Sequence, residues 1–159
     1  MGHTVTDREK LIVEKIKEGT VIDRIPPGKA MKILHLLKID EDYPYTVAIA
    51  LRVPSDKMEL KDVVKIKGKQ LSVKELQKLS FIAKGATVNI IEDYQVKQKI
   101  ELTIPSHVDE FIKCLNPNCI SNMREPLLPS FDVISQEPLI LCCIYCDRVI
   151  QGKNLQEQL

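Results

Sequence analysis

The chain has 159 residues, of which 44% are hydrophobic, and its formal net charge at pH 7 is +1. This length suits one domain or a medium domain plus a small one, and we expect two units. A charge so close to zero argues against a nucleic-acid-binding protein, because such proteins usually carry an excess of Lys and Arg. Since no apolar run of roughly 18 residues could span a bilayer, and the first residues lack a secretory signal, we expect a cytoplasmic protein that does not bind membranes.

The first part of the chain predicts a strand, a helix and a second strand. Residues Thr20 to Ile25 are rich in β-branched side chains and end at Pro26-Pro27-Gly28, which is typical of a strand and a turn. The helix that follows has one apolar stripe at helical spacing, formed by Ala30, Ile33, Leu34 and Leu37. The strand Tyr45 to Val53 alternates strictly, and we expect it to bury the face made of Val47, Ile49, Leu51 and Val53.

The same order of elements then recurs. A strand at Val63 to Lys67 places Val64 and Ile66 on one face and two lysines on the other. Ser72 and Glu75 predict a capping box for a second helix, which ends near Gly85 and whose stripe is Val73, Leu76, Leu79 and Ala83. Thr87 to Ile91 and Tyr94 to Leu102 predict two further strands joined by a turn at Glu92-Asp93.

This order predicts an α+β fold, namely a ferredoxin-like βαββαβ sandwich with an extra edge strand. Both helices would cover one face of the sheet and leave the other face free for solvent or a ligand. Pro105 interrupts the pattern, so we divide the chain into a domain at 1–104 and a small β-rich domain at 105–159.

The second domain contains all five cysteines. Cys114 and Cys119 form one short pair and Cys143 and Cys146 another, a spacing typical of a four-thiolate zinc site. Four sulfurs leave no open position on the metal, so the zinc would be structural, and its binding would contribute to folding. Two disulfides or reduced core cysteines are the alternative. We choose Cys143 over Cys142 because its spacing to Cys146 is the commoner one, and we expect Cys142 to be a small core residue.

Evidence for catalysis is weak in this sequence. His3, His35 and His107 show no pairing with a nucleophile, and no phosphate-binding or nucleophile motif is present. The lysine run Lys61, Lys65, Lys67 and Lys69 is most simply a solvated surface. However, Lys65 would project from the open sheet face, where Asp23, Asn89 and Lys99 could also converge, a combination that suits a nucleotide.

The chain resembles the regulatory chains of aspartate carbamoyltransferase over nearly its whole length. The resemblance rests on VEKIKEGTVIDRIPPG, LRVPSDKMELKDVVKIKG, ATVNIIEDYQV, CLNPNCISN and CCIYC. It implies a chain without catalysis of its own, whose N-terminal domain binds CTP and ATP, and in some members UTP. The zinc domain would dock on the catalytic chain.

The resemblance also implies individual residues. The nucleotide-binding positions are Val13, Glu14, Lys15, Ile16, Val21, Asp23, Lys61, Lys65, Asn89, Ile91, Tyr94, Val96 and Lys99. The positions that touch the catalytic chain are Asn116, Asn118, Tyr145, Asp147 and Arg148. Arg24 stands where a histidine is common in the family and Lys15 where a small residue is common, which leaves the ranking of the effectors open.

The family's assembly combines two catalytic trimers with three regulatory dimers, so the resemblance implies a homodimer through the N-terminal domain. A zinc-ribbon protein that binds nucleic acid is the alternative from another class. Its zinc segment would need aromatic or basic residues, whereas this one has few aromatics, no basic cluster and several acidic residues. A metalloenzyme is a third possibility, opposed by the closed set of four sulfurs.

Overall fold

The computed structural model describes residues 15–124 and 127–159. Contacts divide the chain into two compact units, one formed by residues up to 71 together with 86–101 and the other by 72–85 together with 102–159. Among the described residues, no helix has the length and apolar character needed to cross a membrane.

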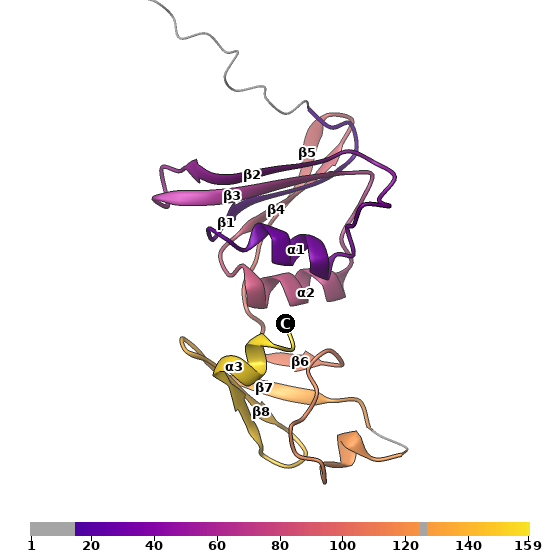
Figure 1. Cartoon of the computed structure of the whole chain (residues 1–159), viewed down its shortest axis with the longest axis vertical. Helices are drawn as coiled ribbons and strands as arrows, with labels where there is room; N and C mark the ends of the chain where they lie inside the picture. Colours follow the sequence, from indigo (N-terminus) through magenta and orange to yellow (C-terminus); the bar gives the residue numbers. More distant parts are fainter. Residues whose placement is uncertain (1–14, 125–126) are drawn as a thin grey trace, which may run out of the picture. The chain divides into compact units, whose positions relative to one another are not determined.

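The first unit is built on a five-stranded antiparallel sheet (Figure 1). Its strands are β1 (Gly19–Ile25), β2 (Val47–Pro54), β3 (Leu60–Lys67), β4 (Thr87–Glu92) and β5 (Gln95–Glu101), and their spatial order is β2-β3-β1-β4-β5. In chain order, with α1 (Ala30–Leu36) and α2 (Val73–Ile82), they follow β1α1β2β3α2β4 and then β5. The predicted ferredoxin-like order with an added edge strand is therefore confirmed.

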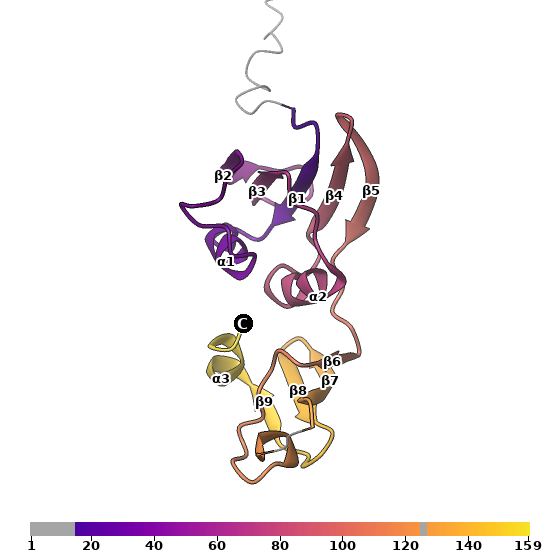
Figure 2. The ribbon, with the colours of Figure 1, turned by 90° about the vertical axis from the view of Figure 1, so that its right-hand side faces the viewer.

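Alternation along the strands separates the two faces of this sheet. Ile22, Val64 and Ile66 are fully buried on the face that carries α1, together with Ile33 of that helix. Gly19 is required at the start of β1, because a Cβ there would lie 2.1 Å from the carbonyl oxygen of Ile66. Figure 2 shows β4 and β5 as a hairpin at the other side of the sheet from β2.

Two details of the first unit correct the sequence prediction. Ile49 and Leu51 of β2 are 39% and 53% exposed, because β2 is an edge strand and a bulge between Ala50 and Val53 interrupts its alternation. The β4–β5 turn is at Asp93 and Tyr94, both of which have positive φ, and not at Glu92-Asp93. Two consecutive residues in this conformation are typical of a type I′ hairpin.

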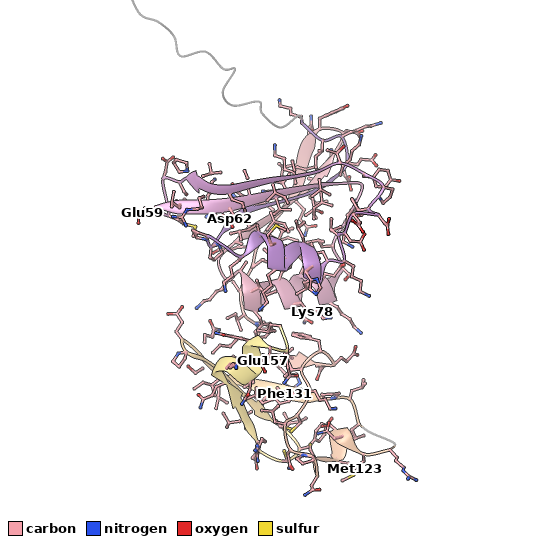
Figure 3. The ribbon with its side chains drawn as sticks, viewed as in Figure 1. Glu59, Asp62, Lys78, Met123, Phe131 and Glu157 are labelled. Carbon is pink, nitrogen blue, oxygen red and sulfur yellow. The ribbon has the colours of Figure 1, made fainter. Side chains whose placement is uncertain are left out.

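The second unit contains a four-stranded antiparallel sheet in the order β6-β7-β8-β9. Its elements are β6 (His107–Asp109), the 3-10 helix η2 (Ile120–Asn122), β7 (Ser130–Gln136), β8 (Leu139–Cys143), β9 (Val149–Gln151) and α3 (Gly152–Gln156). Phe131 of β7 lies in its core (Figure 3), together with Leu141, Ile150 and Leu155. Both this sheet and the first one are antiparallel, as the α+β fold class requires.

The helix α2 belongs to this second unit by its contacts, although the sequence placed it in the first domain. Phe81 of α2 joins the core that contains Val108 and Ile112, and its ring packs edge to face on Phe111 at 5.6 Å between centroids. The predicted capping box of Ser72 and Glu75 is present. Val73, predicted to be buried, is 72% exposed because it precedes the segment of α2 that packs into a core.

Candidate functional site

The first candidate site is a cluster of four cysteine sulfurs in the second unit. The Sγ atoms of Cys114, Cys119, Cys143 and Cys146 all lie within 4.8 Å of one another. The Cys114–Cys146 and Cys119–Cys143 sulfur pairs are 3.5 and 3.7 Å apart. Zn–S bonds of about 2.3 Å would place the sulfurs of a regular tetrahedron about 3.8 Å apart, so the cluster fits zinc closely.

Two loops of different construction hold these sulfurs. Cys143 is the last residue of β8, and its backbone N–H donates to the carbonyl of Arg148 at 2.9 Å across the β8–β9 turn. Cys114 and Cys119 lie outside the sheet, between β6 and η2. There the side-chain amide of Asn122 donates to the carbonyls of Cys114 and Asn116, at 2.9 and 2.8 Å.

Burial and hydrogen bonds act in opposite directions on the thiol pKa values of this cluster. Burial raises the pKa of Cys114 to about 12, and the backbone N–H of Asn116 opposes this shift. The Ser121 hydroxyl, 3.2 Å from the sulfur, lowers the pKa of Cys119 to about 7. Burial also raises the pKa of Cys143, against donation from the backbone of Tyr145 and Cys146. A bound cation deprotonates coordinating thiols outright, so metal binding here releases protons.

Cys142 lies outside this cluster. It is paired with Asp132 and Val149 in the sheet, is half-buried, and its thiol pKa is raised chiefly by burial. The choice of Cys143 from the spacing therefore agrees with the sulfur cluster. The donor set is closed, since all four positions around a tetrahedral ion are filled by protein sulfurs, which makes this zinc structural.

The second candidate site lies on the face of the first sheet opposite α1. Val21 of β1 is paired with Lys65 of β3 on one side and Asn89 of β4 on the other, and Asn89 is paired with Lys99 of β5. Directly paired residues of neighbouring antiparallel strands project from the same face. The predicted residues Lys65, Val21, Asn89 and Lys99 thus form one row across four strands, which we call the Lys65–Lys99 row.

Other predicted nucleotide-binding residues lie around this row. Asp23 follows Val21 on the same face, and its carboxylate pairs with the Lys61 ammonium at 2.9 Å. Ile91 is buried and paired with Val96 of β5, whereas Val96 and Tyr94 are 58% and 61% exposed. Of the positions before β1, Lys15 is exposed and Ile16 half-buried, and Val13 and Glu14 lie outside the described residues.

The residues predicted to touch a catalytic chain are mostly exposed. Asn118, Tyr145, Asp147 and Arg148 are exposed and Asn116 is half-buried. All five lie within or beside the two cysteine loops. Asn116 accepts a hydrogen bond from the backbone of Asn118 at 3.0 Å, and the Tyr145 hydroxyl donates to the carbonyl of Leu128 at 3.0 Å.

The sequence contains no sign that any histidine contacts a potential nucleophile, but the ring of His107 contacts the Ser130 hydroxyl. Nε2 lies 2.8 Å from Ser130 Oγ and 3.1 Å from Asp109, while Nδ1 lies 2.7 Å from Asp132. Ser130 is buried and donates its own proton to Asp109 at 2.6 Å, so its oxygen accepts from the histidine and is not an activated nucleophile. The hydrogen bond to Asp132 is the main cause that raises the pKa of His107.

Several supporting residues were not identified from the sequence. Ser121 and Asn122 come shortly after Cys119, separated from it by Ile120, and a hydroxyl or amide side chain so close to a cysteine pair could have indicated a residue that supports the metal ligands. Asp62 is fully buried in β3 and accepts hydrogen bonds from three backbone N–H groups. Its pairing with residues far along the chain has no local sequence signal.

These features define a two-unit class of protein, with a ferredoxin-like sheet in one unit and a structural four-cysteine zinc centre in the other. Comparison with known families makes the assignment specific. Residues 11–103 match the allosteric domain of the aspartate carbamoyltransferase regulatory chain, and residues 106–156 match its metal-binding domain. The chain belongs to this family.

Individual relatives agree. The regulatory chain from Thermoplasma volcanium is 44% identical over 95% of this chain and 99% of its own length. Those from Korarchaeum cryptofilum and Thermococcus gammatolerans are 44% and 45% identical, over 96% and 92% of this chain and 98% and 96% of their own. These proteins are named as regulatory chains, so this chain is a non-catalytic subunit and a partner of the catalytic chain.

Proposed function

We propose that the chain binds the nucleotide effectors CTP and ATP, with UTP as a further candidate, and transmits their binding to the catalytic chains of aspartate carbamoyltransferase in pyrimidine synthesis. The observation that carries this proposal is the Lys65–Lys99 row. Lys65 and Lys99 are separated by three inter-strand steps of about 4.8 Å each, so their backbones are about 14 Å apart and a ligand can lie between the two ammonium groups.

The chemistry of this row suits a nucleotide. Lysine ammonium groups bind phosphate oxygens, and the Asn89 amide offers both a donor and an acceptor to a base or ribose. The Asp23–Lys61 ion pair at the same face can open to release a further cation toward phosphate. Arg24 is half-buried next to this pair and adds positive charge. Val13, Glu14, Lys15, Ile16, Ile91, Tyr94 and Val96 would complete the pocket.

The second unit, which holds the four-cysteine site and is called the zinc unit from here on, supports a docking role. Asn116, Asn118, Tyr145, Asp147 and Arg148 would contact the catalytic chain, and the zinc would keep their loops in shape. Exposed apolar side chains lie beside these residues, since Ile120 and Ile144 are 49% and 45% exposed. An apolar surface with a polar rim is the usual anatomy of a protein interface.

We assign residues 1–104 to nucleotide binding and 105–159 to docking. We infer that α2 couples nucleotide binding to docking. It follows β3, which carries Lys65, and precedes β4, which carries Asn89. Its Phe81 packs in the core of the zinc unit, and Lys74 and Lys84 pair with Glu110 and Glu137. A nucleotide that favours one arrangement of these strands would shift the zinc unit and bias the catalytic trimers between two states.

The edge strand β2 supports a homodimer. Ile49 and Leu51 are exposed on it, and an unpaired edge with apolar side chains is a template for pairing with a second copy. Three such dimers with two catalytic trimers would complete the family's assembly, which we place in the cytoplasm.

The test is nucleotide binding to a Lys65→Ala chain, measured by calorimetry. Loss of one ammonium–phosphate contact should weaken CTP binding about tenfold to a hundredfold, with zinc content unchanged. Lys29→Ala is the matched control, because Lys29 is exposed at the start of α1, on the other side of the sheet. Equal CTP affinity in the Lys65 variant and the unmodified chain would refute the pocket.

A further inference from the structure

The two halves of the zinc centre differ in what fixes their backbone. Cys143 ends a strand in the middle of the second sheet, opposite Phe131. Cys114 has no strand partner, because β6 ends at Asp109 and no further element begins until η2 at Ile120 in this described part of the chain. The position of the Cys114 sulfur therefore depends on individual side chains that bind the backbone around it.

One of these side chains is Gln158, which lies just beyond α3. Its Oε1 accepts a hydrogen bond from the backbone N–H of Lys113 at 2.7 Å, and its Nε2 donates to the carbonyl of the same residue at 3.1 Å. The amide thus satisfies both backbone groups of the residue directly before Cys114, as a neighbouring strand would. Both hydrogen bonds lie at the exposed surface of the second unit, so their role is to fix the backbone of Lys113 and not to satisfy buried groups.

Gln158 is itself held in place. Leu155 of α3 is 2% exposed and lies in the same core as Cys114 and Cys119, and Leu159 packs against that core. Leu155 and Leu159, which precede and follow Gln158 in the chain, therefore hold the backbone of Gln158 in place. Glu157, the residue before it, lies beside α3 in Figure 3.

A groove runs along this contact. It has a volume of about 600 Å³ and is lined by Cys114, Pro117 and Asn122 on the cysteine side and by Asn154, Glu157 and Gln158 on the α3 side. Cys114 is the zinc ligand that lines this groove, and it is only 3% exposed, so a small chelator would reach its sulfur once the Gln158–Lys113 contact opens. The groove therefore gives the metal a path to solvent on the side of Cys114.

We propose that Gln158 is a positioning residue for the zinc, which acts through Lys113 to hold Cys114 at its ligand position, and that Cys114 is the first ligand to leave the metal. Without the two hydrogen bonds, the Lys113–Cys114 segment opens locally into the groove. The Cys143–Cys146 half stays in place, because β8 and β9 hold the two ends of its turn. This inference does not depend on nucleotide binding.

The test is zinc release from the full-length, zinc-loaded chain to an excess of a chromogenic chelator, for Gln158→Met and Gln158→Ala. Methionine retains the length and most of the volume of glutamine but cannot make either hydrogen bond. Each hydrogen bond contributes a factor of about 2 to 10, so both variants should release zinc about 4 to 100 times faster than the unmodified chain. Gln95→Met is the control, because Gln95 is exposed on β5 in the other unit.

Hydrogen exchange separates this role from a general loss of stability. In both Gln158 variants, amide exchange should be faster at residues 113–119, apart from Pro117, and unchanged at residues 143–148. Release at the unmodified rate in Gln158→Met would overturn the proposal, including the case in which only the alanine variant is fast, since that result assigns the effect to packing. Equal acceleration of exchange in both cysteine loops would overturn it as well.

Discussion

Replacing the buried carboxylate of Asp62 by an amide should destabilise the first unit strongly. Asp62 is fully buried on β3, on the side of the sheet that carries α1 (Figure 3). One carboxylate oxygen accepts from the backbone N–H of Gly28 at 2.8 Å and of Ala30 at 3.4 Å, and the other from that of Arg52 at 2.9 Å. Arg52 has a φ of 54° at the β2 bulge, so this contact also holds a strained residue.

The magnitude follows from this geometry. An asparagine side chain at this position would have the same size but only one acceptor oxygen, and its NH2 group would face an N–H donor whichever way the amide turns. A hydrogen bond to a charged group contributes about 1.5–3 kcal/mol, and a buried donor left without a partner costs about 1–3 kcal/mol. Relief from burying a charge offsets part of this loss. We expect Asp62→Asn to lower the free energy of unfolding by about 2–4 kcal/mol.

Urea unfolding followed by far-UV circular dichroism measures this loss on the zinc-loaded chain. With a slope of roughly 2 kcal/mol per molar urea, the midpoint should fall by about 1–2 M. Asp56→Asn is the control, because Asp56 is exposed in the β2–β3 loop. A loss below about 1 kcal/mol in the Asp62 variant would show that its hydrogen bonds do not organise the first unit.

Three further predictions concern other parts of the chain. Phe81→Ala should destabilise the zinc unit by about 3 kcal/mol, measured by urea-dependent zinc loss. Val73→Ala, at an exposed position of the same helix, should change the stability little. Equal effects of the two substitutions would contradict the packing of α2. His107 has a raised pKa because of its hydrogen bond to Asp132, so its contribution to stability is present below about pH 6.5 and is lost as the pH rises through the raised value. Thermal melts of the His107→Gln chain should show a weaker fall over that window, and a pH profile identical to the unmodified chain would remove this role. Leu51→Lys on the exposed edge of β2 should give a monomer by sedimentation, and Met31→Lys, also exposed but on α1, should remain a dimer; a dimeric Leu51 variant would place the contact elsewhere.

The sequence predicts those parts of the structure that have a local signal. Alternation defined the two faces of β3, the capping box of Ser72 and Glu75 defined the start of α2, and the spacing to Cys146 selected Cys143 over Cys142. Each of these depends on residues within a few positions of one another, so the pattern and the structure have the same physical cause.

Features that depend on what covers a face were not predictable in the same way. The apolar side of β2 has a clear pattern, but Leu51 is exposed because β2 is an edge strand and its bulge changes the alternation. The stripe of α2 identified Leu79 and missed Phe81, whose partners come from residues 104–155. The Gln158–Lys113 contact joins positions 45 residues apart, and neither helical nor strand periodicity in the sequence indicates it.

The Lys65–Lys99 row could be predicted from the sequence only in part. Sequence alternation put Lys65 on the face opposite the core, but only the strand order β3-β1-β4-β5 brings Asn89 and Lys99 into line with it. β1 lies between β3 and β4 because the connections through α1 and α2 cross over the sheet. The sequence of a single strand contains no information about these connections.

The central claim is that nucleotide on the first sheet controls catalytic trimers through the zinc unit. The most direct measurement is aspartate saturation of the assembled enzyme, formed from this chain and catalytic trimers of the same organism, with and without CTP and ATP. A coupling free energy of roughly 1–3 kcal/mol predicts that nucleotide changes the half-saturating aspartate concentration about fivefold or more. The Lys65→Ala assembly should have the same particle size and should need about tenfold to a hundredfold more CTP for the same response. Saturation curves that are unchanged by either nucleotide in the unmodified assembly would contradict the account.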